Sequence, residues 1–252
     1  GETYRFNWSS PILISPHNHR TLWFGGNRLF KSVDRGDSWT VVSPDLTTND
    51  PSKLNPRAGV TPEDTGAERH CTIVTISESP LRVDTVWVGT DDGQVQLTQD
   101  GGKTWTNVTA NIPDLPANTW VSRIEASRFG QGRAYATFDG HRSNDFRPYV
   151  YVTEDFGKTW SKITNGLSED DSMYAFAEGT QNPDLLFAGS ERGLYVSLDR
   201  GTSWFRMHRD IGFPTVRVDD LTIHPRELDL IVATHGRGLW ILPISALEQL
   251  NA

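Results

Sequence analysis

The chain has 252 residues, a formal net charge of −8 and 36% hydrophobic residues, enough to bury the core of a single domain spanning 1–252. Its lysines and arginines form no run, which excludes the clustered positive charge of a nucleic-acid groove. No apolar stretch approaches the length of a membrane span, so we expect no membrane insertion. The single cysteine, Cys71, excludes an internal disulfide.

The chain opens with strand-like sequence. Residues 4–8 (Tyr-Arg-Phe-Asn-Trp) alternate between large and polar side chains, as a β-strand does. Three further strand candidates follow at 12–14, 21–25 and 29–31. The third leads into Ser32–Trp39, which reads Ser/Thr-x-Asp-x-Gly-x-Ser/Thr-Trp, and the tryptophan of this motif begins a fourth strand.

The same eight-residue motif occurs four times, which indicates internal duplication. Its copies are Ser32–Trp39, Thr98–Trp105, Thr153–Trp160 and Ser197–Trp204. Each predicts a hairpin turn in which the Asp carboxylate accepts backbone N–H groups further along and the Gly takes a positive φ. The Trp is expected to wedge between neighbouring repeats. We assign a structural role to Asp34, Gly36, Trp39, Asp100, Gly102, Trp105, Asp155, Gly157, Trp160, Asp199, Gly201 and Trp204.

Aligning the chain on this motif gives five units, of which four have three strands before the motif and one after it. Their approximate bounds are 9–44, 70–109, 119–164, 172–207 and 216–242. The fifth unit lacks both the motif and a fourth strand. We expect residues 3–8 to supply that strand, because an unpaired sheet edge invites aggregation.

Four-stranded antiparallel units repeated around an axis predict an all-β fold of the β-propeller type. The simplest arrangement has five blades closed by the N-terminal strand. Strand patterns do not fix the number of blades, so the alternative is part of a larger ring or a ring assembled from more than one chain.

The topology sorts the connections onto two faces. Turns between the second and third strands share one face with the links between blades, here called the loop-rich face, and the motifs lie on the opposite motif face. The longest connection, 43–69, ends on the loop-rich face at Glu68, Arg69 and His70. Polar turns are ordinary, yet charges of both signs converge here. The binding candidates are Arg28, Asp92, His141, Arg142, Glu191, Arg192, His235 and Arg237.

Several charged residues lie on or beside the innermost strands, where they need partners or water. They are Arg123, Glu125, Arg217, Asp219 and Asp220. We expect Arg–carboxylate pairs that tie the blades together. The alternative is a pair of carboxylates facing each other at glycosidase separation, drawn from Asp92, Asp139, Glu191, Asp219 and Asp220.

The pair His17 and His19 is a weak metal signal, since no third ligand is placed nearby. We predict no required metal, no cofactor and no catalytic residue.

The motif resembles the Asp-box, or bacterial neuraminidase repeat, of propeller proteins that include sortilin-type receptors, xyloglucanases, sialidases and photosystem II assembly factors. Residues 4–8, 120–123 and 233–242 resemble large bacterial proteins labelled sortilin-like or glycosyl-hydrolase-like. The chain looks like their C-terminal propeller portion, which implies a bacterial origin and export to the periplasm or outside the cell. Sialidases carry an Arg-Ile-Pro motif near the N-terminus. Here Arg123-Ile124 is followed by Glu125, so no sialidase residue is carried over.

Two functions follow from this pattern. The favoured one is a non-catalytic binding propeller that recognises a peptide, protein or glycan on its loop-rich face. The alternative is a glycoside hydrolase of sialidase or xyloglucanase type, or a fragment of one. Carboxylates that pair with Arg favour the binder, and an unpaired facing pair favours the hydrolase. A second copy or another propeller is a further possible partner.

Overall fold

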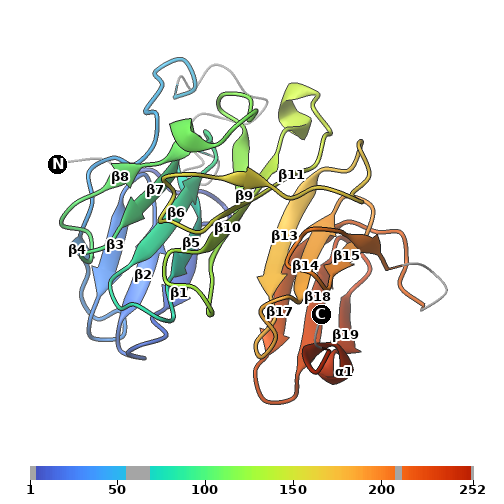
Figure 1. The fold of residues 1–252 in the computed structure, drawn as a ribbon. Helices are drawn as coiled ribbons and strands as arrows, with labels where there is room; N and C mark the ends of the chain where they lie inside the picture. Colours follow the sequence, from blue (N-terminus) through green and yellow to red (C-terminus); the bar gives the residue numbers. More distant parts are fainter. Residues whose placement is uncertain (1–3, 55–68, 208–211, 251–252) are drawn as a thin grey trace.

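The computed structural model describes residues 4–54, 69–207 and 212–250. It is all-β and consists of five antiparallel sheets that follow one another in chain order (Figure 1). The first sheet contains β1 (Ile12–Ile14), β2 (Leu22–Gly25), β3 (Leu29–Ser32) and β4 (Thr40–Val41). The second contains β5 (Ile73–Glu78), β6 (Val86–Thr90), β7 (Val95–Thr98) and β8 (Thr106–Asn107). The third contains β9 (Trp120–Ala126), β10 (Ala134–Asp139), β11 (Tyr149–Thr153) and β12 (Ser161–Lys162).

The last two sheets differ in size. The fourth has four strands and the fifth has three. Their strands are β13 (Met173–Glu178), β14 (Leu186–Ser190), β15 (Leu194–Ser197) and β16 (Phe205–Arg206); β17 (Val218–His224), β18 (Asp229–Thr234) and β19 (Leu239–Pro243). A single helical turn, α1 (Ser245–Glu248), follows β19. Among the described residues, no helix is long and apolar enough to span a membrane.

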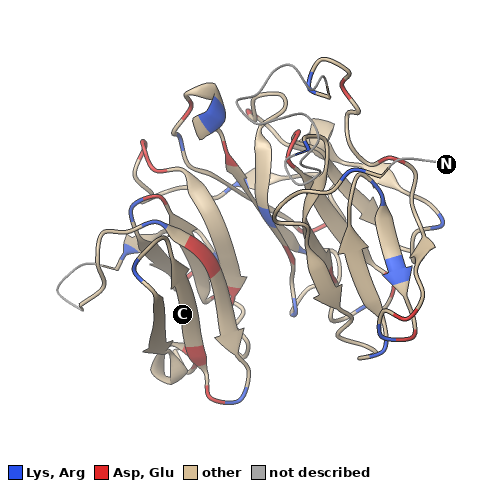
Figure 2. Cartoon of the chain, turned by 180° about the vertical axis from the view of Figure 1, so that it is seen from behind, with Lys and Arg blue, Asp and Glu red and all other residues tan. Residues whose placement is uncertain are grey.

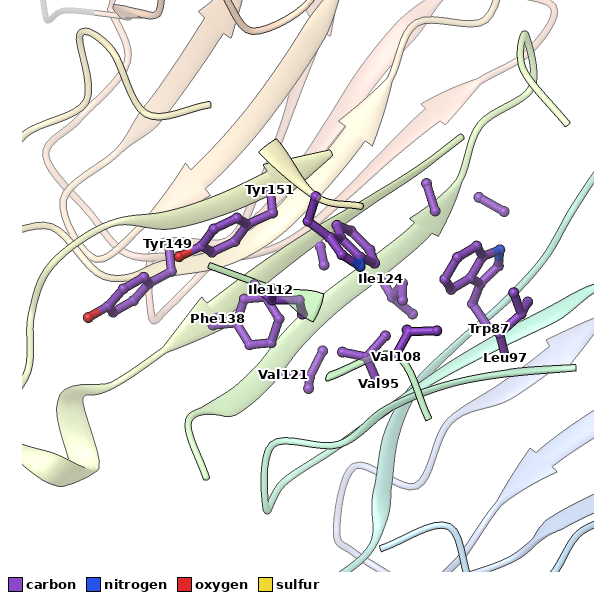
Figure 3. Close-up of a cluster of buried hydrophobic side chains, with 14 residues drawn as sticks. Trp87, Val95, Leu97, Val108, Ile112, Val121, Ile124, Phe138, Tyr149 and Tyr151 are labelled. Carbon is purple, nitrogen blue, oxygen red and sulfur yellow. The ribbon is translucent and has the colours of Figure 1, made fainter. Parts of the chain in front are cut away.

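The core lies between consecutive sheets. Figure 3 shows the cluster between the second and third sheets, where Trp87 and Leu97 from one meet Val121, Ile124 and Tyr151 from the other. β10, β13 and β14 are buried along their whole length, because a sheet covers each of their faces. The first and fifth sheets stand at opposite sides of the molecule (Figures 1 and 2).

Each motif forms the turn between the third and fourth strands of its sheet. In the first copy, Asp34 Oδ1 accepts the Ser38 backbone N–H at 2.9 Å and Oδ2 accepts the Ser38 hydroxyl at 2.6 Å. Gly36 has a φ of +97°, and its N–H donates to the Ser32 hydroxyl. Asp100, Asp155 and Asp199 accept the equivalent N–H at 2.9, 2.8 and 2.9 Å. The four corners are therefore closed by bonds inside the motif itself.

Three of the four motif tryptophans contact the sheet that precedes their own. Trp105 Nε1 donates to the Val42 carbonyl at 3.1 Å, and Trp204 Nε1 donates to the Ile163 carbonyl at 2.9 Å. Trp160 packs edge-on against Trp87 of the second sheet with ring centroids 6.0 Å apart. These three wedge between sheets, as expected. Trp39 is 39% exposed and packs on Phe24 of its own sheet.

The N-terminal residues do not close the ring, which corrects the expected fourth strand of the last sheet. Arg5 is joined to Asn27 by two hydrogen bonds, one from each backbone N–H, and its guanidinium pairs with Asp45 at 2.7 Å. Phe6 stacks on Phe24 with ring centroids 5.4 Å apart. Residues 4–8 lie against the first sheet because its outer face offers aromatic rings, and the fifth sheet keeps three strands.

The C-terminal turn is fastened to the fourth sheet. The Glu248 carboxylate, 5% exposed, accepts the backbone N–H groups of Thr180, Gln181 and Asn182 at 2.7, 2.9 and 2.9 Å. Asn182 in turn donates to the Leu250 carbonyl. This connection joins the end of the fifth sheet to the loop between β13 and β14.

Candidate functional site

The loop-rich face contains a cavity of about 360 Å³ at the meeting point of the third, fourth and fifth sheets. Acidic and basic residues both occur in the loops that connect the sheets (Figure 2). Its lining residues are His141, Phe146, Asp170, Ser172, Tyr174, Glu191, Arg192 and Arg217. Three of the predicted binding residues, His141, Glu191 and Arg192, thus come together.

The fourth sheet supplies the floor. Asp171, fully buried, accepts the Ser190 hydroxyl at 2.9 Å, the Tyr195 hydroxyl at 2.9 Å and the Arg192 backbone N–H at 3.1 Å. Burial raises the pKa of Asp171, and these three donors oppose that rise. They fix the β14–β15 turn, which holds Glu191 and Arg192 at the cavity.

Tyr174 connects the fourth and fifth sheets. The Arg217 guanidinium lies 4.0 Å from the centroid of the Tyr174 ring, a cation–π contact. Burial raises the pKa of Tyr174, and the carboxylates of Asp139 and Glu191 add to this rise. The Tyr174 hydroxyl lies 3.5 Å from His141 Nδ1. A flat ring with a cation above it and a carboxylate at its edge therefore forms one wall.

The third sheet contributes a histidine on a short 3-10 helix, His141–Ser143. His141 Nδ1 lies 2.5 Å from Oδ2 of the buried Asp139, a contact in which the ring nitrogen donates. Nε2 then remains the ring nitrogen available to a ligand. Arg142 lies 3.2 Å from Asp139 and stacks on Trp120 at 4.0 Å from the ring centroid, outside the cavity lining.

The other predicted binding residues are not among those that line the cavity. Asp92 is fully buried and accepts the Thr48 backbone N–H and hydroxyl at 2.7 Å each, so it anchors the long connection. Arg28 donates to the Ser43 carbonyl at 3.1 Å. His235 Nδ1 lies 3.2 Å from Asp219, and Arg237 is exposed in the same β18–β19 turn.

The end of the long connection is only partly described. Glu68 lies outside the described residues. His70 Nδ1 is 3.5 Å from Asp91, a buried carboxyl that also accepts the Thr72 backbone N–H. Burial raises the pKa of Asp91. These contacts hold the connection against the second sheet, away from the cavity.

Four of the five carboxylates proposed for hydrolysis have hydrogen-bond or ion-pair partners within the described residues. Three pair with arginines, in the contacts Asp139–Arg142, Asp219–Arg217 and Asp220–Arg123. Asp92 accepts hydroxyl groups of Thr48 and Thr90. By the criterion stated above, the arginine pairs favour a binding site. Glu191 lines the cavity, and none of the ion pairs among the described residues includes it.

The two histidines considered for a metal point to different partners. His17 Nε2 contacts the Ser79 carbonyl at 2.8 Å, and His19 Nε2 lies 3.2 Å from Arg35. Over residues 4–54, 69–207 and 212–250, no three His, Cys, Asp or Glu side chains gather as a metal site would require.

Sequence reasoning missed part of the lining: Phe146, Asp170, Ser172 and Tyr174 were not candidates, and Arg217 was expected as a blade-tying charge. Tyr174 and Arg217 lie at or just before the first residues of the innermost strands β13 and β17, at the loop-rich face. An aromatic residue and a cation near the starts of the innermost strands of consecutive units were the available signal.

Comparison with known proteins gives one family match. A family model described as BNR/Asp-box repeat matches residues 151–162, which contain the third copy of the motif. In sequence, the chain is 31% identical over 158 residues to a probable oligoxyloglucan-reducing end-specific xyloglucanase of Neosartorya fischeri. The matched region covers 57% of this chain and 18% of the fungal protein, so the chain spans less than a fifth of that relative.

Solved structures share the fold. The GH74 xyloglucanase from Xanthomonas campestris superposes with a TM-score of 0.64 at 19% identity, covering 96% of this chain and 36% of the enzyme. PorZ of Porphyromonas gingivalis, described as a bacterial surface component of the type-IX secretion system, gives a TM-score of 0.63 at 17% identity. That match covers 100% of this chain and 34% of PorZ.

Proposed function

Starting from an all-β, propeller-like domain that carries the BNR/Asp-box repeat and is related to glycoside hydrolases, we propose that this chain is a non-catalytic glycan-binding module. The observation that carries the proposal is the cavity at the loop-rich face, lined by aromatic rings, a histidine and charges of both signs. Such a set of convergent polar groups around apolar surface is typical of a ligand site.

The cavity has the chemistry that a sugar needs. Phe146, 47% exposed, offers a ring face that the apolar side of a pyranose can cover. Arg192, Arg217 and Glu191 offer donors and an acceptor for hydroxyl groups. Their partners within the protein hold these groups in place before binding, which reduces the entropy lost when a ligand binds. The xyloglucanase relatives make xyloglucan oligosaccharides the first ligands to test.

An exported location accords with this proposal. One solved neighbour is titled the extracellular domain of a putative one-component system, and another is a surface component of a secretion system. We extend that location to this chain as part of the proposal, since free polysaccharide is met outside the cell.

Calorimetric titration with xyloglucan oligosaccharides tests the proposal. We expect saturable binding, and we expect Phe146→Ala and Arg192→Ala each to raise Kd by about tenfold, which corresponds to roughly 1.4 kcal/mol. Phe129→Ala is the matched control, because Phe129 is an exposed phenylalanine in the β9–β10 turn on the motif face. Binding that responds equally to all three substitutions, or no binding to any glycan, would remove the cavity as a glycan site.

A hydrolase is the second candidate, because two carboxylates, Asp170 and Glu191, line the same cavity. Hydrolysis requires two positioned carboxyl groups in distinct protonation states. Asp170 forms an ion pair with Arg192 at 2.9 Å, so one of these two carboxylates already has an arginine partner. Release of reducing sugar that disappears in both Asp170→Asn and Glu191→Gln would replace the binding proposal with this one.

A further inference from the structure

We propose that the glycan bound in the cavity carries a protonated amine and that Glu191 is the carboxylate that receives it. The amine assignment rests on the proposed function, because it names the class of sugar that the same cavity takes. That class is an amino sugar whose amino group is free and therefore positively charged.

The charges in the cavity favour a cation. Each arginine of the lining already pairs with a carboxylate: Arg192 with Asp170 at 2.9 Å, and Arg217 with Asp219 at 2.6 Å. Glu191 is exposed at the cavity, and none of the ion pairs among the described residues includes it. An entering cation therefore meets a carboxylate that no arginine pairs with. An entering anion would have to compete with Asp170 and Asp219 for their arginines.

Glu191 lies beside two other cavity residues of the fourth sheet. Its backbone N–H donates to the Ser172 carbonyl at 3.0 Å. Burial raises the pKa of Tyr174, and the nearby Glu191 carboxylate adds to this rise. Ser172 is 1% exposed, and its hydroxyl group has no hydrogen-bond partner within the part of the chain that the structure describes. A buried polar group left unpaired costs free energy, which a donor from a ligand would recover.

An ammonium group matches these acceptors. It has three N–H donors and no acceptor, so the carboxylate of Glu191 and the hydroxyl oxygen of Ser172 can both accept from it. Nε2 of His141 is a further acceptor in the neutral ring, whose Nδ1 donates to Asp139. Phe146, 47% exposed, offers a ring face that attracts a cation as well as the apolar side of a sugar. The hydroxyl groups of a neutral sugar would leave the charge of Glu191 unpaired.

Calorimetric titration with three trisaccharides of the same linkage tests the assignment. They are the β-1,4-linked trimers of glucosamine, of N-acetylglucosamine and of glucose, used at a pH at which the glucosamine amine is protonated. N-acetylation removes the charge and keeps the ring. We therefore expect the glucosamine trimer to bind about fivefold more tightly than the acetylated trimer at low ionic strength, the size of effect that an exposed ion pair gives. Added salt should reduce this preference, because ions screen an exposed charge pair.

Glu191→Gln should bring the ratio of these two Kd values to about one. Glu169→Gln is the matched control, because Glu169 is an exposed glutamate in the β12–β13 connection on the same face and outside the cavity lining. It should keep the preference of about fivefold. The control separates a contact at Glu191 from the general attraction of cations to a chain with a net charge of −8.

The outcomes separate this assignment from the proposed function. Equal Kd values for the glucosamine and acetylated trimers would overturn the amine assignment and leave the cavity as a glycan site. No binding of any trimer or of xyloglucan oligosaccharides would remove the proposed function as well. A preference that persists in Glu191→Gln, or falls as far in Glu169→Gln, would overturn the role of Glu191. A lysine tripeptide that binds as tightly as the glucosamine trimer would overturn the assignment to a sugar.

Discussion

Carboxylates of one chemical type take opposite roles in this protein because their donors and burial differ. Asp100 receives the hydroxyl and backbone N–H of Thr104, which lower its pKa to about 2. Burial raises the pKa of Glu125 to about 7, and the neighbouring Glu178 carboxylate adds to that rise. The first closes a turn as an anion, and the second lies at a sheet junction where its neutral form is favoured.

Glu125 should make stability pH-dependent. The folded carboxyl keeps its proton up to about pH 7, whereas an unperturbed glutamate releases it near 4.5. The folded state therefore binds more protons in this window, and stability falls as the pH rises through it. Glu125→Gln should remove the loss, so the variant gains about 1–3 kcal/mol over the unmodified chain at pH 8 compared with pH 5. Urea unfolding at both pH values measures this difference. If the variant and the unmodified chain differ in unfolding free energy by the same amount at pH 5 and pH 8, the raised pKa of Glu125 is contradicted.

The motif tryptophans should differ in energetic weight. Trp204→Ala removes a ring that is 3% exposed and leaves a cavity at the junction of the third and fourth sheets, so it should cost about 3–5 kcal/mol. Trp39→Ala removes a half-exposed ring with no preceding sheet and should cost about 1–2 kcal/mol in the monomer. Guanidinium unfolding of both variants gives the comparison. Equal losses would show that the ring acts within its own sheet.

At the level of elements, the turns determine their own shape, while the ends of the chain depend on distant partners. α1 is one turn long and cannot be stable through its own hydrogen bonds. Its position is set by Glu248, whose carboxylate satisfies three backbone N–H groups of the β13–β14 loop.

Glu248→Ala should therefore destabilise the chain by about 2–4 kcal/mol, because it leaves three N–H groups of a closed loop without an acceptor. Glu227→Ala is the control, since Glu227 is an exposed glutamate in the β17–β18 turn. Thermal unfolding followed by circular dichroism compares the two. A loss in Glu227→Ala as large as that in Glu248→Ala would mean that general charge, and not this contact, stabilises the C-terminal end.

The sequence anticipated the elements better than their partners. The four motifs and the strands around them were readable because the turn chemistry is local, and the all-β propeller-like fold agrees with the solved neighbours. The packing position of residues 4–8 could not be predicted, because it depends on the stacking of Phe6 against Phe24 and Phe30 of the first sheet. Strand pattern alone gives no such information.

The site was anticipated in part for a similar reason. His141, Glu191 and Arg192 stand in turns, and topology alone assigns turns to a face. Tyr174 and Arg217 begin strands, where the choice between cavity and core depends on the tilt of neighbouring sheets. The sequence does not encode that tilt locally.

At the scale of the whole molecule, the five sheets form a row in which inner members are covered on both sides and end members on one. When each repeat contacts only its nearest neighbours, the inner repeats are therefore more stable against local unfolding than the end repeats.

Hydrogen exchange followed by mass spectrometry should report that gradient. In the monomer we expect the slowest exchange in β10, β13 and β14, which are fully buried, and the fastest in β1 and β19, whose outward side chains are exposed. Uniform exchange across the five sheets would show that they open as one unit.

The hydrogen bonds that close each corner of the motif stay within eight residues and on the side opposite the cavity. Loops on the loop-rich face can therefore change in length or sequence without loss of any hydrogen bond within the motif turns. For protein engineering, this makes the β14–β15 turn and the segment around His141 natural places to insert new recognition loops.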